Sequence, residues 1–240
     1  MSDRTLPLPT PQVVIFDLDY TLVRPSDKFE APGYVRTGAL FGLELDPGRW
    51  PQAERAAYVA ARERRERTGL IHDDGLLRVI ARAIIGGLGG GSRDAIERTT
   101  AAIIEAWSEA ENFGLYDDVL PCLDTLRGAG VRMAVLSNAI GHGLEDMVAH
   151  FALDGYLDAA VSSAATGAVK PAPRMFSALL ALLGVAPAGA VMVGDSVEDD
   201  VEGAVACGCG AILLDRTGRA VGAPLPRIES LAALPAALSL

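Results

Sequence analysis

Short apolar runs that end abruptly in polar residues recur along this chain and predict buried strands. The runs are continuous and rich in β-branched residues, as expected for strands covered on both faces of a parallel sheet. Strands are expected at residues 13–16, 131–136, 158–161, 190–193 and 211–214. Helical segments are expected between or after them at residues 117–127, 173–183, 198–206 and 228–240. This alternation predicts an α/β fold with a Rossmann-like, doubly wound parallel sheet of five strands.

The first two predicted strands are separated by residues 17–130, far more chain than a parallel crossover needs. An inserted domain is therefore expected. The insert has helical spacing at residues 51–68, 73–85 and 93–111, and the glycine-rich segment 86–91 separates the last two. We expect a discontinuous α/β core domain, residues 1–24 and 114–240, and an α-helical domain, residues 25–113.

Two carboxylates follow the first predicted strand directly, at Asp17 and Asp19. Open α/β sheets bind ligands at the carboxyl ends of their strands, so both side chains are expected where a substrate binds. A carboxylate can attack phosphorus, and two neighbouring anions beside an anionic substrate need a cation between them. The pair therefore predicts phosphoryl chemistry with Mg²⁺, although solvated turn carboxylates remain an alternative for the pair taken alone.

Three other predicted strand ends carry complementary groups. Ser137 and Asn138 offer a hydroxyl and turn amides to phosphate oxygens, and Lys170 offers an ammonium that balances phosphate charge. Taken singly, Ser137 could cap a helix and Lys170 could be a solvated lysine. The fourth strand ends in an acidic cluster suited to a hard cation, with Asp195, Ser196, Asp199 and Asp200.

Together these segments resemble the four motifs of the haloacid dehalogenase (HAD) superfamily. The first reads D-x-D-x-T, and the others are Ser137 with Asn138, Lys170 with Pro171, and Gly-Asp-Ser followed by a later Asp. Four motifs in order at strand ends are far more specific than any one of them. The helical insert resembles the helical (C1) cap of subfamily I, which closes over small substrates. The motif residues are Asp17, Asp19, Thr21, Ser137, Asn138, Lys170, Pro171, Gly194, Asp195, Ser196 and Asp200.

This resemblance implies a role for each matching residue. Asp17 would attack phosphorus, and Asp19 would protonate the leaving oxygen and later activate water. Lys170 would neutralise Asp17 before attack. Magnesium would be held by Asp17, the Asp19 carbonyl oxygen and Asp195, with Ser196, Asp199 and Asp200 outside its direct ligands. The phosphoryl oxygens would be bound by Thr21, Ser137, Asn138 and Lys170.

Five positions have an open interpretation. Tyr20 stands where the family often has glycine, and it either packs over the mouth of the site or only shields the turn. His142 follows the second motif and either contacts the leaving group or packs. Tyr34 and Arg36 are placed in a loop-like stretch near a cap entrance, with a surface role as the alternative. Asp199 replaces a frequent asparagine, and it would tighten metal binding or cap a helix.

Composition narrows the possible partners. A net charge of −10 without a basic stripe argues against nucleic acid and leaves small phosphorylated metabolites. Residues 1–11 lack the apolar core of a signal peptide, and no segment has the pattern of a membrane span. The three cysteines are typical of a protein in a reducing compartment. We expect a cytoplasmic monomer or homodimer.

The predicted function is a magnesium-dependent phosphatase that hydrolyses a small phosphate monoester through an aspartyl-phosphate. A phosphomutase is the alternative within enzymes, and a non-catalytic phosphometabolite-binding protein is the alternative outside them. Dehalogenation is disfavoured because Asp19 is intact, whereas true haloacid dehalogenases typically replace it. The sequence does not specify the leaving group.

Overall fold

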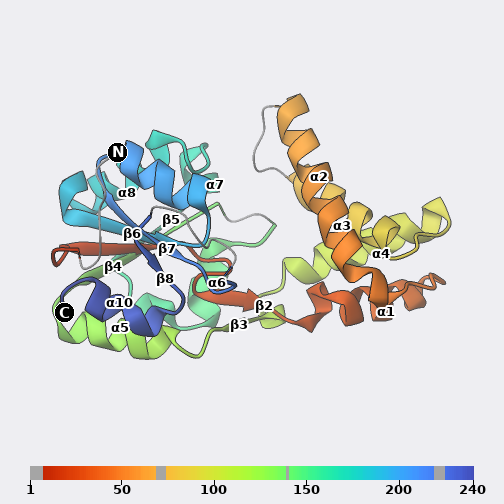
Figure 1. Cartoon of the computed structure of the whole chain (residues 1–240), viewed down its shortest axis with the longest axis horizontal. Helices are drawn as coiled ribbons and strands as arrows, with labels where there is room; N and C mark the ends of the chain where they lie inside the picture. The colour runs from red at the N-terminus through yellow and green to blue at the C-terminus, as the bar shows by residue number, and fades with distance from the viewer. Residues whose placement is uncertain (1–7, 69–73, 139–140, 219–224) are drawn as a thin grey trace. The chain divides into compact units, whose positions relative to one another are not determined.

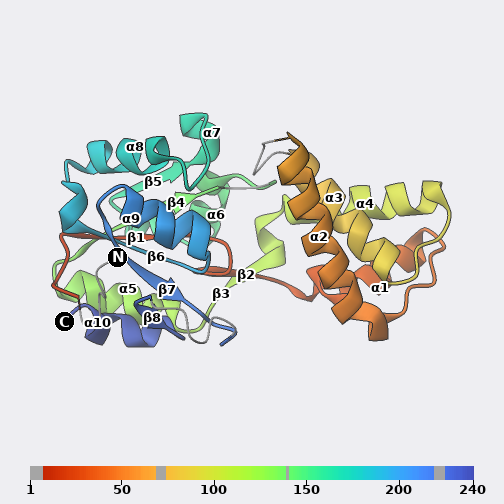
Figure 2. The ribbon, with the colours of Figure 1, turned by 45° about the horizontal axis from the view of Figure 1, so that its top comes forward.

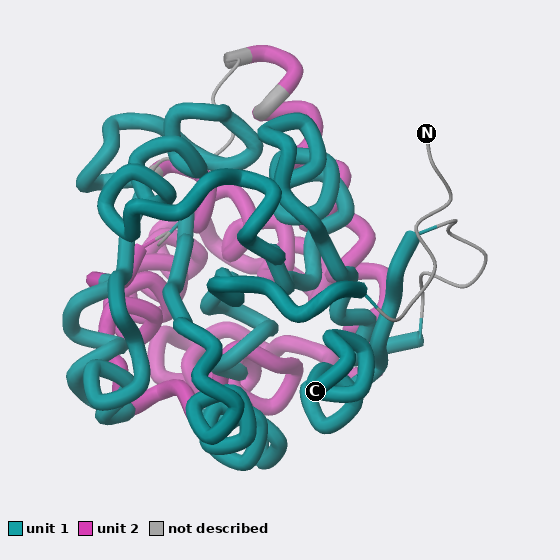
Figure 3. Tube along the Cα trace, turned by 90° about the vertical axis from the view of Figure 1, so that its left-hand side faces the viewer, with its two compact units in different colours: residues 1–24, 115–139, 144–240 teal, residues 25–114, 140–143 magenta. Residues whose placement is uncertain are grey.

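The computed structural model describes residues 8–68, 74–138, 141–218 and 225–240. The chain forms two compact units, which Figure 3 colours separately. The core unit comprises residues 1–24, 115–139 and 144–240, and the helical unit comprises residues 25–114 and 140–143. These units differ from the expected division at residue 114 and at residues 140–143, which group with the helices.

A single parallel sheet organises the core unit, as predicted (Figures 1 and 2). Its strand order is β5-β4-β1-β6-β7-β8. The prediction of five strands was wrong by one, because Leu213 and Leu214 of β7 also pair with the short β8. The strands are β1 (Val13–Phe16), β4 (Arg132–Ser137), β5 (Ala159–Ser162), β6 (Ala190–Gly194), β7 (Gly210–Leu214) and β8 (Arg227–Ile228).

Helices lie on both faces of this sheet, with α8 on one side and α5 and α10 on the other (Figure 1). Helix α8 begins with proline at its first position and ends at Gly184, which adopts a left-handed conformation with φ of 64°. Both features match the sequence preferences of helix ends. The core helices are α5 (Val119–Gly128), α6 (Leu144–His150), α7 (Ser163–Thr166), α8 (Pro173–Leu183), α9 (Gly203–Ala206) and α10 (Leu234–Ala237).

The apolar face of α8 supplies much of the core. Phe176 and Leu179 are fully buried, and they belong to one hydrophobic cluster with Ile15, Leu136 and Met192 of the central strands. Burial of each such side chain stabilises the fold by about 1.5–3 kcal/mol. The face of the sheet that α8 covers is therefore fixed by packing.

Two predicted helices of the core have a different form. Residues 198–206 divide into a π-helical turn, Val197–Glu202, and the short α9, and π-helical turns are common at functional sites. In the tail, the expected helix at residues 228–240 is reduced to a 3₁₀ turn, Leu231–Ala233, and α10. The reason is that the tail first extends, since Ile228 joins the sheet beside Leu214.

The helical unit contains four helices among the described residues: α1 (Ala31–Leu40), α2 (Trp50–Thr68), α3 (Asp74–Gly87) and α4 (Arg93–Trp107). The predicted start of α3 at residue 73 lies outside the described residues, and α4 ends earlier than expected, before a 3₁₀ turn at Ala110–Asn112. Helix α1 was not predicted. It contains Tyr34 and Arg36, which were expected in a loop-like stretch. Helices α2 and α3 approach closely, since a Cβ on Gly87 would lie 2.5 Å from the Ala53 Cα.

An aromatic cluster explains why residues 140–143 belong to the helical unit. The ring of His142 lies 5.5 Å from Phe113 and 6.5 Å from Trp107, and Trp107 lies 4.7 Å from Phe29. Beside it, a Cβ on Gly141 would lie 2.2 Å from the Leu77 Cδ1. The chain otherwise passes between the units in β2 (Val23–Pro25) and β3 (Phe113–Leu115), which pair with one another.

Candidate active site

Parallel pairing brings three of the predicted motifs to one edge of the sheet. Phe16, the last residue of β1, pairs with Val135 of β4 and Val193 of β6. Asp17 follows Phe16 directly, and its backbone N–H donates to the Val193 carbonyl at 2.9 Å. Ser137 and Asp195 stand two residues beyond the paired positions on the neighbouring strands. The carboxyl ends of the central strands therefore form the site, as expected for open α/β sheets.

Lys170 joins this edge from the loop between α7 and α8. Its side chain is only 2% exposed, and its Nζ lies 2.5 Å from Asp17 Oδ1 and 2.7 Å from Asp200 Oδ1. A buried ammonium is costly unless it is paired, and here two carboxylates share it. Lys170 is thus a fixed positive charge beside Asp17.

The charges around Lys170 and Asp17 shift both pKa values. Burial lowers the pKa of Lys170, but the negative charges of Asp17 and Asp200 and their hydrogen bonds outweigh it, so the pKa is raised above its ordinary value. For Asp17, burial raises the pKa well above its ordinary value, and Lys170 only partly offsets this. Asp200, Asp195 and Asp19 raise the Asp17 pKa further. A bound cation would favour the ionised form of Asp17, because it adds positive charge to this acidic cluster.

Carboxylate oxygens of Asp17, Asp195 and Asp200 lie within 4.8 Å of one another. Oxygen-only donors are the set that Mg²⁺ prefers, so the residues present fit that ion. Asp195 is exposed, yet its pKa is raised to about 7, first by partial removal from water and then by the charge of Asp200. Mutual repulsion of these carboxylates is what a divalent cation would relieve.

Asp200 is held by contacts at both of its oxygens. Oδ1 accepts from Lys170, and Oδ2 accepts from the backbone N–H of Ser196 at 3.0 Å. Gly194 makes this approach possible, since a Cβ there would lie 2.2 Å from Asp200 Oδ2. The hydroxyl of Ser196 accepts from the Asp199 N–H at 3.1 Å, so Ser196 supplies the cap of the π-helical turn. The sequence G-D-S-x-x-x-D is therefore one hydrogen-bonded structure.

Asn138 of the second motif binds the backbone of Lys170. Asn138 accepts from the Lys170 backbone N–H at 2.7 Å through its side-chain oxygen, and its amide nitrogen donates to the Lys170 carbonyl at 3.4 Å. Ser137 is 1% exposed at the end of β4. The hydroxyl of Ser163 donates to the Asn138 carbonyl at 2.6 Å. Asn138 thus orients the Lys170 backbone in addition to lying at a strand end.

A compact turn carries the rest of the first motif. The Leu18 carbonyl accepts from the backbone N–H of Leu22 at 2.8 Å and of Val23 at 3.0 Å. Tyr20 has a φ of 61°, a left-handed backbone conformation that favours glycine, and its side chain is 46% exposed. Among the described residues, the fully buried Thr21 hydroxyl has no hydrogen-bond partner. A buried hydroxyl in that state is suited to bind an oxygen of a ligand.

Other candidates lie apart from these contacts. Asp19 is half-buried in the same turn but is not part of the three-carboxylate cluster. His142 packs in the aromatic cluster of the helical unit. Tyr34 is buried, with its ring 5.8 Å from Trp50, and Arg36 forms an exposed ion pair with Asp27 at 3.0 Å. Sequence reasoning also missed Arg216, which donates to the Thr21 carbonyl at 2.9 Å and carries no signal beyond its place after a strand.

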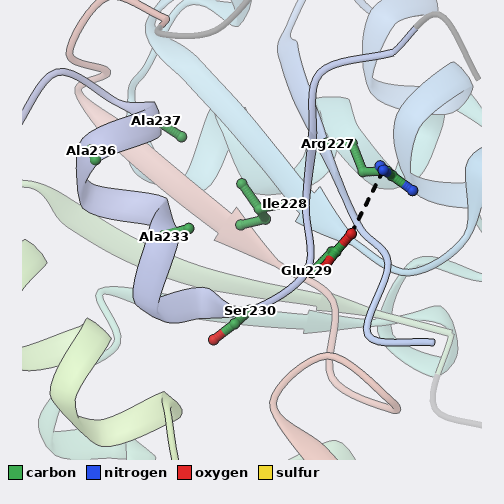
Figure 4. A pocket seen from close by; sticks show the side chains of 7 residues that line it. All are labelled: Arg227, Ile228, Glu229, Ser230, Ala233, Ala236 and Ala237. Carbon is green, nitrogen blue, oxygen red and sulfur yellow. Dashed lines mark ion pairs between the residues drawn. The ribbon is translucent and has the colours of Figure 1, made fainter. Parts of the chain in front are cut away.

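A surface pocket of the core unit, drawn in Figure 4, contains none of the motif residues. Its charged side chains, Arg227 and Glu229, pair with one another at 3.7 Å. It therefore shows no concentration of charge like that at the strand ends. The pocket is lined by Arg227, Ile228, Glu229, Ser230, Ala233, Ala236 and Ala237.

Comparison with known proteins decides the family. Residues 11–208 match the haloacid dehalogenase-like hydrolases. The chain belongs to this family. The family resemblance read from the four motifs is thereby confirmed.

Two relatives of the HAD-like chain are phosphatases by name. It is 35% identical over 129 residues to N-acylneuraminate-9-phosphatase of Mus musculus, which covers 52% of each protein. It is 27% identical over 213 residues to glyceraldehyde 3-phosphate phosphatase of Methanopyrus kandleri, which covers 85% of this chain and 84% of that protein. The chain spans about half the length of the mouse relative it matches.

A solved structure supports the fold of the HAD-like chain. The HAD-hydrolase YfnB of Bacillus subtilis, bound to magnesium, aligns with a TM-score of 0.74 at 15% identity. The alignment covers 96% of this chain and 100% of that one.

Among the described residues, no helix has both the length and the apolar character to span a bilayer.

Proposed function

We propose that this HAD-like hydrolase is a magnesium-dependent phosphatase that hydrolyses a small phosphate monoester through an aspartyl-phosphate on Asp17. The observation that carries the proposal is the buried contact of Asp17 with Lys170, 2.5 Å long, beside the carboxylates of Asp195 and Asp200. Lys170 contacts Oδ1 of Asp17, and we propose that a bound cation would share this oxygen, which leaves the other oxygen for attack. A fixed positive charge at this point also attracts a phosphate dianion.

In the first step, Asp17 forms a bond to phosphorus while the bond from phosphorus to the alcohol oxygen breaks. Asp19 donates a proton to that oxygen, so a neutral alcohol leaves. In the second step, Asp19 takes a proton from water, and the water oxygen attacks phosphorus and releases Asp17 with inorganic phosphate. The exposure of Asp19, intermediate rather than buried, supports this role because an acid-base group must reach both the alcohol and water.

The phosphoryl oxygens are proposed to bind Lys170, the hydroxyl groups of Thr21 and Ser137, and the backbone amide of Asn138, whose side chain is engaged by the Lys170 backbone. The buried hydroxyl of Thr21, which has no partner among the described residues, is a direct argument for its role. Fixed donors around these oxygens stabilise the charge that shifts onto them during transfer.

A bound Mg²⁺ would screen the repulsion between the substrate and the carboxylates and stabilise the transferring phosphoryl group. We propose Asp17, Asp195 and the carbonyl oxygen of Asp19 as its protein ligands. Asp200 has both oxygens engaged by Lys170 and Ser196, which supports a role outside the direct ligands. Ser196 holds Asp200 through its backbone, and Asp199 belongs to the same capped turn.

A phosphorylated small metabolite is the proposed substrate class. The two relatives act by name on different alcohols, a sialic acid derivative and a triose, but both hydrolyse a phosphate ester. The net charge of −10 supports a small substrate rather than a nucleic acid. The helical unit is proposed as the cap that selects among such substrates. We further propose that the protein works in the cytoplasm as a monomer or homodimer.

The test is phosphate release by the purified chain over a panel of phosphate esters, with magnesium and with chelator. The panel includes N-acylneuraminate 9-phosphate, glyceraldehyde 3-phosphate, phosphoglycolate and a nucleoside monophosphate. Magnesium-dependent release that Asp17→Asn abolishes is the expected result. Asp94→Asn is the control, because Asp94 is an exposed first-turn residue of α4 in the helical unit. Release that is unchanged in Asp17→Asn would contradict the mechanism, and transfer of phosphate between sugars would identify a mutase.

A further inference from the structure

Arg216 contacts the turn of the first motif from outside the four motifs. One of its terminal nitrogens, Nη2, donates to the Thr21 carbonyl at 2.9 Å. The same residue forms a two-pronged pair with Asp118, with both N–O distances at 2.9 Å. Arginine can make these three hydrogen bonds at once because its donors are fixed in one plane, whereas a lysine ammonium cannot reproduce that fork.

Asp118 is also held by the segment that contains Ser230 and Leu231. Its Oδ2 accepts from the Ser230 hydroxyl at 2.6 Å and from the Leu231 backbone N–H at 2.9 Å. Burial raises the pKa of Asp118, but the hydrogen bonds of Arg216 and Ser230 outweigh it, so the pKa lies below its ordinary value. Asp118 therefore remains ionised at neutral pH and keeps Arg216 in one orientation.

Tyr116 completes the arrangement. The guanidinium of Arg216 lies over the Tyr116 ring, with its central carbon 3.8 Å from the centroid. The backbone N–H of Tyr116 donates to the Leu22 carbonyl at 3.1 Å, so it holds the same turn at the next residue after Thr21. Stacking of this kind stabilises a cation by about 0.5–2 kcal/mol and limits its movement. We call Tyr116, Asp118, Arg216 and Ser230 the Arg216 cluster.

We infer that Arg216 is a positioning residue for the first-motif turn, and that it acts through the Thr21 carbonyl to fix both Thr21 and Asp19. The side chains of Arg216 and Asp118 are 15% and 16% exposed, so water competes little for the hydrogen bonds of this pair. The Arg216 cluster connects the first-motif turn, which follows β1, to segments that follow β3 and β7 and to the segment before α10. These contacts hold the turn in which Tyr20 has a left-handed conformation. The structural role of Arg216 does not depend on the proposed function, whereas its expected effect on phosphate-ester hydrolysis rests on that function.

The kinetic test compares Arg216→Met with Arg227→Met on two phosphate esters. Arg227 is a matched control, since it also forms an ion pair at 2.9 Å, with Asp215, but makes none of the hydrogen bonds of the first-motif turn. One ester is 4-nitrophenyl phosphate, whose leaving group needs little protonation, and the other is an alkyl phosphate, which depends on Asp19. Arg216→Met should lower kcat/KM about 100-fold for the alkyl ester and tenfold or less for the nitrophenyl ester, because kcat/KM reports formation of the aspartyl-phosphate, the step in which the two leaving groups differ.

A general loss of structure would lower kcat/KM equally for both esters, and that result would overturn the inference. An equal loss in Arg227→Met would overturn it as well. Amide hydrogen exchange supplies a readout that does not need activity. Exchange at Leu22 and Val23, whose N–H groups donate to Leu18, should be at least tenfold faster in Arg216→Met, while β1 exchange is unchanged. If the wild-type chain hydrolyses neither ester, the proposed function fails, and the exchange measurement still decides the role of Arg216.

Discussion

The strand-end site of the core unit and the helical unit use charge in opposite ways. At the strand ends, Lys170 is 2% exposed and is shared by two carboxylates. In the helical unit, Arg82 pairs with Glu97 at 2.5 Å, but both side chains are more than a third exposed. The helical unit is held by apolar and aromatic packing around Trp107 instead.

This difference separates charge that is needed for chemistry from charge that keeps a surface solvated. Removing charges from water is costly, so a buried cluster persists only where every member has partners. Around Lys170 the charged partners are Asp17, which follows β1, and Asp200, which lies in the π-helical turn after β6, and both charges raise the pKa of Lys170. Exposed pairs contribute little and are independent of their neighbours. The two regions should therefore respond very differently to the same kind of substitution.

Replacing the buried cation should have the largest effect. Lys170→Met leaves Asp17 and Asp200 facing one another without their shared ammonium, which should lower the free energy of unfolding by about 3–5 kcal/mol at neutral pH. Phosphate release should fall at least 100-fold, because a fixed positive charge beside the nucleophile is lost. Urea denaturation and the phosphate-release assay measure the two effects.

The loss of stability in Lys170→Met should be smaller at pH 5, because Asp17 and Asp195 have raised pKa values and take up protons more readily as the pH falls. Arg62→Met is the matched control, since Arg62 forms an exposed i,i+4 pair with Glu66 in the helical unit. Equal losses of stability in the two variants would refute the contrast between the regions.

A pair of glycines tests the contrast through packing. Gly194→Ala would place a Cβ 2.2 Å from Asp200 Oδ2, so Asp200, which also contacts Lys170, must shift. We expect a loss of about 1–3 kcal/mol in the free energy of unfolding and a large loss of phosphate release. Gly86→Ala in α3 meets no atom within 4 Å and should stabilise the protein by about 0.5–1 kcal/mol. Full activity in Gly194→Ala would show that the position of Asp200 is unimportant.

The pH dependence of stability should also have opposite signs in the two regions. The pKa of Asp195 is raised from 3.8 to about 7. A raised carboxyl pKa means that the folded state binds the proton more tightly, so this contribution is complete below about pH 4 and is lost as the pH rises to about 7. The pKa of Glu97 is lowered, mainly by its hydrogen bond from Arg82, so its contribution is lost as the pH falls.

Urea denaturation in chelator should detect the Asp195 contribution as a decline in stability between pH 4 and 7. Asp195→Asn should make this decline shallower, and Glu97→Gln should not. Magnesium should stabilise the wild-type protein more at pH 8 than at pH 5, because the cation binds the ionised carboxylates. A magnesium effect that is independent of pH would argue against carboxylates as the ligands.

Much of the core and the positions of its motifs could be predicted from the sequence. The run Val13–Phe16 is apolar throughout, and α8 has proline at its start and glycine at its end, so both ranges were predicted correctly. Asp17, Lys170 and Asp195 stand at strand ends or in nearby loops, and parallel pairing brings them to one edge without long-range detail. The short β8 escaped prediction, because a strand of two residues has no periodicity of its own.

The remaining features depend on contacts that no local pattern encodes. Helix α1 has little amphipathic character, and its residues include Pro32, Gly33 and Gly38, which are typical of loops. His142 follows the second motif in sequence but packs with Trp107 and Phe113, which are distant in sequence. Arg216 and Asp118 are 98 residues apart, so their pairing is visible only in three dimensions. Long-range side-chain contacts, rather than backbone elements, were the part that sequence reasoning missed.

Removing one exposed cation should have the smallest effect. Arg82→Gln breaks the ion pair with Glu97, but Arg78 also lies 3.8 Å from that carboxylate, so part of the attraction remains. The expected change in the urea midpoint is smaller than that of Gly86→Ala and opposite in sign. Because the pair is exposed, about 1 M salt should screen the effect away, whereas the loss in Lys170→Met should persist in salt because water and ions do not reach a buried ammonium. A salt-insensitive loss in Arg82→Gln would mean that surface charge supports the helical unit after all, and the distinction between the two regions would then be one of degree.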